Sequence, residues 1–209
     1  MRAHTIRCLA LAIAAPLVAC RSPRAEAAGV PAVVTLHNGP NAVDLLGDGS
    51  TAQVFVARRD NGNAHGFSSV AFYVRQLAPE FGPPPDTLWQ LVPFFGGPGD
   101  PPAGGDTFTT GEGADCALGD LRIVRRPTGP VQVVVAAREL GASFADSART
   151  TFTTYELRHN IEGVVGWPTY YFASVRTVPA SHEYCDVNEA FARELHLGTT
   201  GVARAEGGR

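Results

Sequence analysis

Residues 58–66 gather the polar chemistry of the chain into one short stretch. Its nine residues include arginine, aspartate, asparagine and histidine side chains. Arg59 could hold a carboxylate through two parallel hydrogen bonds, and Asn61, Asn63 and His65 could donate or accept hydrogen bonds beside it. The stretch predicts a binding site for a small anionic ligand. A hairpin loop braced by an arginine–carboxylate pair is the other interpretation, because Asn and Asp also favour turns.

A second stretch of the chain repeats this arrangement. Residues 54–59 (Val-Phe-Val-Ala-Arg-Arg) match residues 133–138 (Val-Val-Val-Ala-Ala-Arg) at an offset of 79, and Leu-Gly-Asp at 46–48 recurs at 118–120 at an offset of 72. The matches predict an internal duplication, in which two strand-loop-strand units pack face to face. Chance recurrence among β-strands is the alternative.

Arg138 and Glu139 stand where the second of these loops begins. They offer the same guanidinium and carboxylate chemistry as the first loop, so we include both in the candidate ligand site. The bracing interpretation applies to them equally.

Signatures of catalysis and metal binding are missing from the sequence. All 17 basic residues are arginine, which excludes Schiff-base lysines, P-loop lysines and Ser-Lys dyads. There is no Gly-x-Ser-x-Gly elbow, no Cys-His arrangement and no spaced set of histidine ligands. We expect no enzyme, no metal and no cofactor. An unrecognised hydrolase is an alternative, in which Glu112, Asp115 and Asp120 would do general acid-base work.

The segment 44–49 (Asp-Leu-Leu-Gly-Asp-Gly) is similar to a calcium-binding loop, with carboxylates at its first and fifth positions. Leu46 occupies the third ligand position, and Ala52 and Gln53 follow where another carboxylate is expected. A tight Asp-Gly turn is the expected structure. A calcium-binding or carbohydrate-binding β module of the cell envelope is the alternative function that this segment suggests.

The first 19 residues read as an export signal. Arg2 and Arg7 precede an apolar run of 12 residues at 8–19, which is short for a permanent membrane span. The run closes at Leu17-Val18-Ala19-Cys20, which resembles the lipobox of bacterial lipoproteins, in which the cysteine takes the lipid. Cleavage after Ala28 is the alternative. Either way we expect an exported, periplasmic protein, anchored to the membrane through Cys20 by a flexible tether at 20–30.

Export leaves two cysteines in the folded part, Cys116 and Cys185. Two thiols in an oxidising compartment are expected to pair. A bridge that encloses about 70 residues would stabilise the fold by roughly 4 kcal/mol through loop entropy. Loss of the two leader arginines leaves 15 basic against 20 acidic residues, a charge of about −5. Nucleic acid is therefore excluded as a partner.

A mainly β single domain is predicted for residues 31–197, followed by a disordered tail at 198–209. The apolar runs rich in Val, Thr, Phe and Tyr indicate a β-sandwich-like core. Asp186 or Asn188 caps a short C-terminal helix that ends near Leu195, with Gly198 as its stop. The predicted strands are 32–36, 52–57, 68–74, 87–95, 121–124, 131–137, 150–157 and 169–175.

Several motifs together resemble the periplasmic carbapenem intrinsic-resistance proteins that accompany carbapenem biosynthesis clusters. The matching segments span nearly all of the mature chain and lie at 36–39, 44–49, 57–61, 63–67, 91–95, 113–116, 137–139 and 184–187. The resemblance implies a β-rich exported domain that protects its producer from a β-lactam without a hydrolase signature. It supplies no catalytic residues.

The leading hypothesis is therefore a non-enzymatic resistance protein that binds the antibiotic or shields its target. A carbapenem carries a carboxylate that Arg59 or Arg138 could engage, while Asn61, Asn63 and His65 could contact its carbonyl groups. The membrane would be reached only through the lipid on Cys20. The sequence indicates no oligomeric state.

Overall fold

Alternation of buried and exposed side chains defines the strands of the computed structural model, which describes residues 32–62, 66–76, 88–96, 105–112, 116–199 and 201–202. In β3, for example, Ala52, Val54 and Val56 are buried while Phe55 between them is exposed. Within these ranges no helix is long and apolar enough to cross a membrane. The strands are β1 (Ala32–Val34), β2 (Gly39–Val43), β3 (Ala52–Arg59), β4 (Phe67–Gln76), β5 (Leu88–Leu91), β6 (Phe94–Phe95), β7 (Phe108–Thr109), β8 (Gly111–Glu112), β9 (Ala117–Arg125), β10 (Gln132–Arg138), β11 (Ala148–His159) and β12 (Tyr170–Tyr184), followed by helix α1 (Val187–Glu194).

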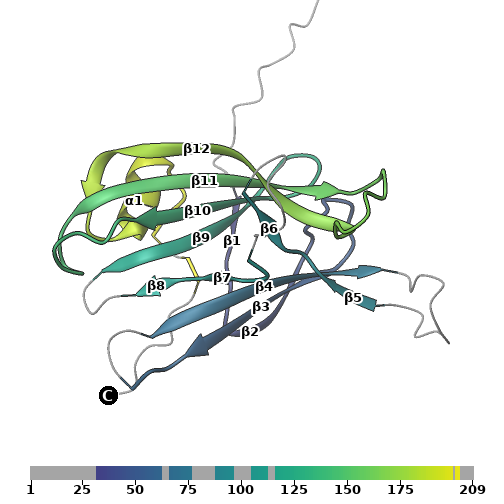
Figure 1. Cartoon of the computed structure of the whole chain (residues 1–209), viewed down its shortest axis with the longest axis horizontal. Coiled ribbons are helices and arrows are strands. Elements are labelled where there is room, and N and C mark those ends of the chain that lie inside the picture. The colour runs from purple at the N-terminus through teal and green to yellow at the C-terminus, as the bar shows by residue number, and fades with distance from the viewer. Residues whose placement is uncertain are drawn as a thin grey trace, which may run out of the picture.

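These strands form two sheets (Figure 1). One has the order β2-β3-β4-β5 with β7 also paired to β4, and the other has the order β1-β9-β10-β11-β12-β6 with β8 paired to β9. Every pairing is antiparallel except that of β12 with β6. The chain passes between the sheets at Val92-Pro93, where Val92 N–H donates to Phe72 of β4 and Pro93 O accepts from Phe172 of β12.

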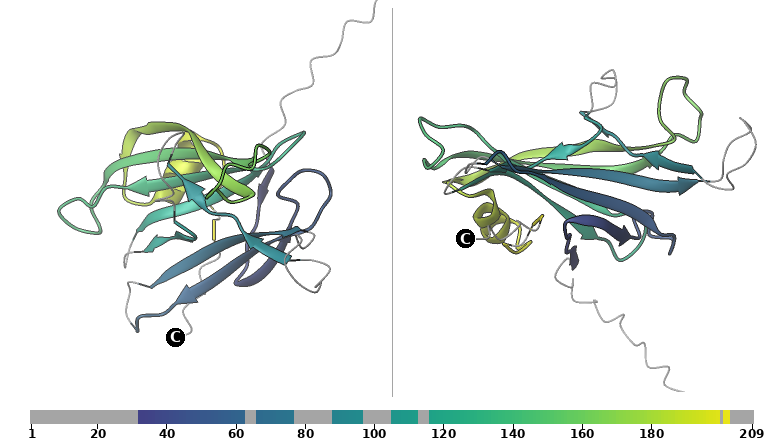
Figure 2. Two further views of the ribbon diagram at one scale, coloured as in Figure 1. Left: turned by 45° about the vertical axis from the view of Figure 1, so that its right-hand side comes forward. Right: turned by 90° about the horizontal axis from the view of Figure 1, so that it is seen from below.

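Apolar side chains between the sheets make the main core. Phe72, Phe94 and Phe172 meet at its centre, with ring centroids 4.8 to 5.4 Å apart. Val54 of β3 and Val133 of β10 belong to this core from opposite sheets. Figure 2 shows the sheets as stacked layers, the blue one below and the green one above in its left view.

A second core lies on the other face of the larger sheet, where α1 packs. Phe191 of the helix belongs to the same apolar cluster as Val134, Ala136 and Phe152 of β10 and β11. Both faces of β10 are therefore covered, which explains why its sequence is a continuous apolar run. Among the described residues, no helix covers the outer face of the five-stranded sheet.

The predicted fold class is confirmed, and all eight predicted strands correspond to observed ones, with 87–95 divided between β5 and β6. The sequence missed β2 and the two-residue strands β7 and β8. The C-terminal helix is confirmed, with Asp186 as its N-cap accepting from Asn188 N–H at 2.7 Å. The helix ends at Glu194. The first residue with a positive φ after the helix is His196, two positions before the predicted stop at Gly198.

Val202 lies within the predicted tail at 198–209. This residue is 6% exposed, forms a β-bridge with Leu36, and its apolar side chain belongs to the main core. Val202 thus packs against the domain. The predicted signal at 1–19, the tether at 20–30 and Cys20 lie outside the described residues.

The two predicted repeats occupy equivalent places. Strands β2 to β5 and strands β9 to β12 are each consecutive antiparallel meanders, one in each sheet, and the 54–59 and 133–138 matches are their second strands. The 46–48 match is not equivalent, since it lies in a loop whereas 118–120 lies within β9. Duplication itself stays a prediction.

Candidate functional site

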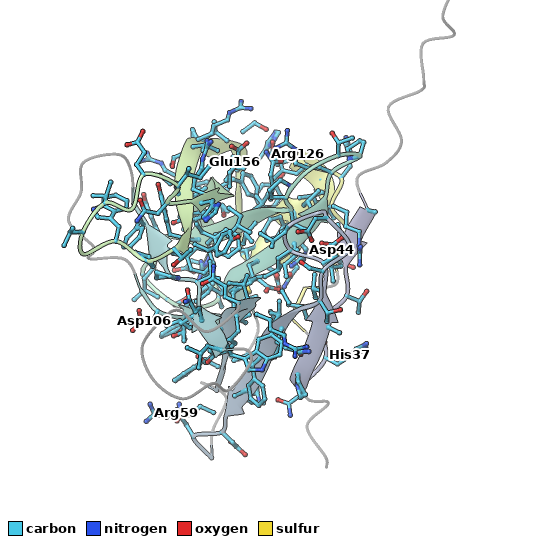
Figure 3. The ribbon with its side chains drawn as sticks, turned by 90° about the vertical axis from the view of Figure 1, so that its right-hand side faces the viewer. His37, Asp44, Arg59, Asp106, Arg126 and Glu156 are labelled. Carbon is cyan, nitrogen blue, oxygen red and sulfur yellow. A yellow bond between two sulfur atoms is a disulfide. The ribbon has the colours of Figure 1, made fainter. Side chains whose placement is uncertain are left out.

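The first half of the predicted site lies at the end of β3. Arg59 is exposed, and its guanidinium stands 5.3 Å from the centroid of the Phe67 ring on the neighbouring strand. Asn61 is exposed in the loop that follows. Figure 3 shows Arg59 at the foot of the five-stranded sheet, away from the labelled residues of the larger sheet. Asn63 and His65 lie outside the described residues.

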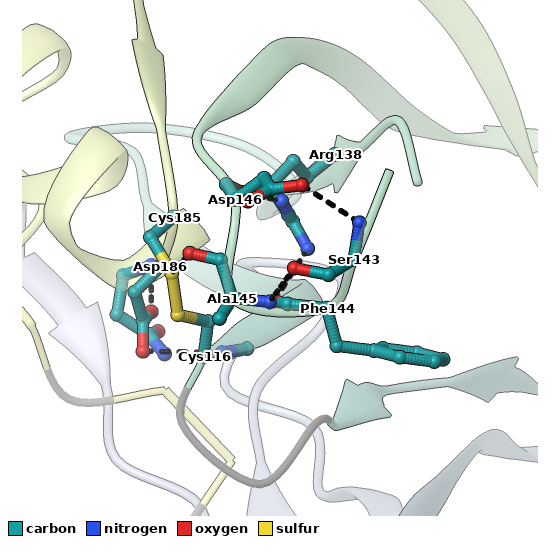
Figure 4. Close-up of a disulfide and its surroundings, with 10 residues drawn as sticks. Cys116, Arg138, Ser143, Phe144, Ala145, Asp146, Cys185 and Asp186 are labelled. Carbon is teal, nitrogen blue, oxygen red and sulfur yellow. Dashed lines mark hydrogen bonds between the residues drawn. A yellow bond between two sulfur atoms is a disulfide. The ribbon is translucent and has the colours of Figure 1, made fainter. Parts of the chain in front are cut away.

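The second half is a brace. Arg138 is 7% exposed, and its guanidinium donates to the backbone carbonyls of Phe144, at 2.9 Å, and Asp146 (Figure 4). It thereby holds the β10–β11 loop in shape. Glu139 is exposed and lies 3.7 Å from Arg149 across the same hairpin. Arg138 thus braces its loop through backbone carbonyls, where the bracing interpretation predicts an arginine–carboxylate pair.

Strand geometry keeps the two halves apart. Val54 and Val133 both face the shared core, and Arg59 and Arg138 each follow five positions later. Because side chains alternate along a strand, an odd spacing turns each arginine to the face away from that core. The two arginines therefore lie on opposite sides of the sandwich, so among the described candidates Arg59 and Arg138 do not share one site.

The structure instead offers a shallow pocket on the outer face of the five-stranded sheet. It measures about 350 Å³ and is lined by Pro40, Gln53, Phe55, Tyr73 and Trp89, one or two from each of four adjacent strands. We call it the outer-face pocket. Phe55 is 45% and Trp89 51% exposed. Large aromatic side chains left open to water on one sheet face are typical of a surface that binds something.

Cross-strand register brings the pocket residues together. Pro40 lies opposite Phe55, and Gln53 lies opposite Tyr73. Trp89 lies opposite Arg75, which is also exposed, so a guanidinium stands at the edge of the aromatic surface. An apolar floor with an amide, a phenol and a neighbouring cation suits a compact ring system that bears a carboxylate.

Sequence reasoning missed this pocket, although one signal was present. Phe55 falls on the exposed parity of β3, between the buried positions Val54 and Val56. An aromatic residue at the solvent position of an alternating strand can be recognised from sequence. Its meeting with Tyr73 and Trp89 depends on strand pairing.

Of the three acidic residues in the hydrolase alternative, the structure describes the side chain of Asp120. Asp120 is buried and forms an ion pair of 3.1 Å with Arg122, whose side chain is fully buried. Burial raises the pKa of the Asp120 carboxyl, and the Arg122 charge opposes that rise. Asp120 is thus part of a structural pair in this fold. Asp115 and the Glu112 side chain lie outside the described part.

A polar cluster joins the end of α1 to β12. Glu194 accepts from Ser181 Oγ, at 2.6 Å to each carboxylate oxygen, and from Tyr184 Oη at 2.9 Å. These hydrogen bonds lower the pKa of Glu194 to about 2. His182 Nδ1 contacts both Ser181 Oγ (3.1 Å) and Glu194 (3.3 Å). In a catalytic triad one imidazole nitrogen contacts the nucleophile and the other contacts the carboxylate. Here Nδ1 of His182 makes both contacts, so the cluster does not have the arrangement of a catalytic triad.

The Asp44 loop has the geometry of a turn. Asp44 Oδ1 and Oδ2 accept from the backbone N–H groups of Gly47 (2.7 Å) and Gly49 (3.0 Å), and Asp48 accepts from Ser50 N–H (2.8 Å). Its carboxylates are thus engaged by the loop's own backbone. No group of three or more His, Cys, Asp or Glu side chains suited to a metal occurs among the residues that the structure describes.

Cys116 and Cys185 form the predicted disulfide, with their Cα atoms 5.6 Å apart. The bridge connects the residue before β9 to the residue before the N-cap of α1, and Asp186 beside it also accepts from Ala117 N–H at 3.2 Å. The Cys185 sulfur lies 3.1 Å from Ala145 O, which is a contact only, since a disulfide sulfur carries no proton. Figure 4 shows the β10–β11 loop lying against this bridge.

Fold and surface define a two-sheet β-sandwich protein with an open aromatic face on one sheet. The chain is similar to the crystal structure of CarG, with a TM-score of 0.60 and 21% sequence identity, over 80% of this chain and 98% of that chain. At this identity the likeness shows a shared fold. No family model matches the chain, and no curated protein matches it.

Proposed function

We propose that the protein is an exported, non-enzymatic factor that confers intrinsic resistance to a carbapenem, by binding the drug or by shielding its target. The observation that carries the proposal is the set of motifs along the sequence that resemble carbapenem intrinsic-resistance proteins. The fold shared with CarG, over 98% of that chain, supports it.

The outer-face pocket is our proposed site for the binding step. Its volume of about 350 Å³ lies in the range of small-molecule sites. A carbapenem is a compact fused ring system with one carboxylate. Phe55 and Trp89 would cover its apolar face, and the Arg75 guanidinium would pair with the carboxylate. This replaces Arg138, whose donors serve its own loop.

Location in the periplasm, with a lipid on Cys20, belongs to the same proposal. The leader and the lipobox-like sequence support it. The Cys116–Cys185 bridge is in keeping with an oxidising compartment. Mass spectrometry of the mature N-terminus tests the lipid directly.

A susceptibility assay with drug recovery tests the function. The full chain is expressed in a carbapenem-sensitive host, growth is scored against drug concentration, and the drug in the medium is followed by mass spectrometry. Survival with intact drug is the expected result. Survival with ring-opened drug would instead identify a hydrolase, and a host that gains no survival from the expressed, exported chain would refute the resistance role.

Two variants connect the assay to the pocket. W89A and R75Q should lose protection while their thermal midpoints stay unchanged, because both side chains are exposed. R126Q is the matched control, since Arg126 is exposed directly after β9 of the larger sheet. Full protection by W89A and R75Q would refute this site and leave target shielding as the mechanism.

Glycan binding is a second candidate, favoured by the three aromatic side chains Phe55, Tyr73 and Trp89 on one open sheet face. Aromatic rings offer flat apolar surfaces on which sugar rings can lie. Co-sedimentation with purified peptidoglycan tests it: pelleting of the wild type, lost in W89A, would support a cell-envelope module. A wild type that stays in the supernatant would refute it.

A further inference from the structure

The loop between β11 and β12 presents aliphatic side chains to water. Val165 is 97% exposed, Ile161 81% and Val164 48%. In Figure 1 the loop lies at the right-hand end of the long β11–β12 hairpin. These three aliphatic residues of one loop, which we call the tip, form an exposed apolar patch that folding does not bury.

Hydrogen bonds fix the shape of this tip. The Asn160 side chain accepts from Val164 N–H at 3.0 Å and donates to Val164 O at 3.2 Å. Backbone bonds from Gly163 N–H to Asn160 O and from Trp167 N–H to Val164 O complete the turn. The aliphatic side chains are therefore held outward by a defined loop structure.

Aromatic rings form the base of the tip. Trp167 and Tyr171 lie 5.1 Å apart, and both contact Phe95, at 5.1 and 5.3 Å between ring centroids. An aliphatic end backed by Trp and Tyr is the order of side chains found where proteins cross from lipid hydrocarbon to headgroups.

The charges around the tip favour uncharged lipid. The chain carries no arginine between Arg158 and Arg176, and Arg158 is paired with Glu156 at 2.8 Å. Glu162 is the one charged residue within 160–171, so electrostatic attraction to anionic headgroups is not available. Insertion would rest on apolar burial alone.

We propose that the 160–167 loop inserts into the surface of a lipid bilayer, as a membrane contact separate from the predicted lipid on Cys20. Ile161, Val164 and Val165 enter the acyl region, and Trp167 lies at the headgroup level. This contact holds the domain in one orientation on the membrane. The inference is independent of the carbapenem role.

Depth-dependent fluorescence quenching tests the insertion. The chain has two tryptophans, so W89F leaves Trp167 as the single reporter. The full-length chain is mixed with phosphatidylcholine vesicles whose acyl chains are brominated near the headgroup. Quenching and a blue shift of Trp167 are expected, equally strong when a fifth of the lipid is phosphatidylglycerol.

I161D/V165D in the W89F background is the test variant, and L140D is its control, because Leu140 is 62% exposed on a different loop. Loss of one buried aliphatic side chain weakens partitioning about tenfold, so the double aspartate variant should lose quenching while L140D keeps it. Both should keep the wild-type thermal midpoint. Absence of quenching in the parent, or equal quenching in I161D/V165D, would overturn the proposal; the first result would favour a protein partner for the tip.

Discussion

Replacement of Arg122 by methionine gives the sharpest test of how this fold is held together. The Arg122 side chain is fully buried and donates to Asp120 at 3.1 Å and to Asn188 at 2.6 Å. Its guanidinium also lies 4.3 Å from the centroid of the Phe191 ring. One side chain thus connects β9 to two residues of α1.

The free energy of unfolding that R122M should lose follows from the hydrogen-bond partners that Asp120 keeps in the variant. Asp120 would keep only the N–H groups of Leu121 (2.7 Å) and Val202 (3.3 Å) as partners. Removing one member of a buried ion pair leaves an uncompensated charge and costs about 3–5 kcal/mol. Methionine fills most of the vacated volume, so the loss is mainly electrostatic.

The cost should depend on pH with a definite sign. Burial already raises the pKa of Asp120, and R122M removes the positive charge that opposes the rise. In the folded variant the Asp120 carboxyl then binds its proton more tightly than it does in the unfolded chain. The free energy of unfolding of R122M therefore falls as pH rises from the pKa of Asp120 in the unfolded chain to its higher pKa in the folded protein. R122M should come closer to the wild type at pH 4.5 than at pH 7.

Urea unfolding followed by circular dichroism, with the disulfide intact, measures both effects. R149M is the matched control, because Arg149 and Glu139 form an exposed pair of 3.7 Å and such pairs contribute about 0–1 kcal/mol. A loss below about 1 kcal/mol for R122M at pH 7, or a loss equal to that of R149M, would refute the electrostatic account of this network.

Three further predictions concern the disulfide, the Glu194 carboxylate and the turn at Gly47. C116A/C185A should lower the free energy of unfolding by up to about 4 kcal/mol, since the bridge closes a separation of 69 residues; an unchanged urea midpoint would contradict this. Hydrogen bonds from β12 lower the pKa of Glu194 from its ordinary 4.5 to about 2, so the stabilisation by this carboxylate is complete above pH 4.5 and is lost as the pH falls from there toward 2. An acid titration of E194Q should be flatter than that of the wild type, and coincident curves would disprove the role. G47A should unfold at lower temperature than G49A, because both glycines have positive φ but only at Gly47 would a Cβ overlap the β9–β10 turn; equal midpoints would refute the steric argument.

Comparison of the two repeats shows which of their features could be predicted from the sequence. The segments 54–59 and 133–138 each predicted a strand that ends in arginine, and both strands exist in opposite sheets. Their final side chains differ in environment: Arg59 stands on an open sheet face, and Arg138 binds its own loop. The run Val133–Ala137 contains no polar residue to mark its faces, so sequence could not distinguish the two.

Edge strands were the hardest elements to predict. Strand β2 reads Gly-Pro-Asn-Ala-Val, a composition typical of turns, and is ordered because it pairs with β3 at the edge of its sheet. Proline is tolerated there because its missing N–H does not interrupt a central ladder. Pairing along the sheet outweighed local propensity.

Sequence alone determined the strands with a clear apolar pattern, the capped helix and the disulfide partners, because each depends on local periodicity, on a capping side chain or on a count of two cysteines. Tertiary structure decided which distant residues share a surface. Phe55, Tyr73 and Trp89 come from three strands, and only cross-strand register places them in one pocket. Likewise Arg122 lies 66 residues from Asn188, and their contact exists only because α1 packs on the face of β9 that the other sheet leaves uncovered.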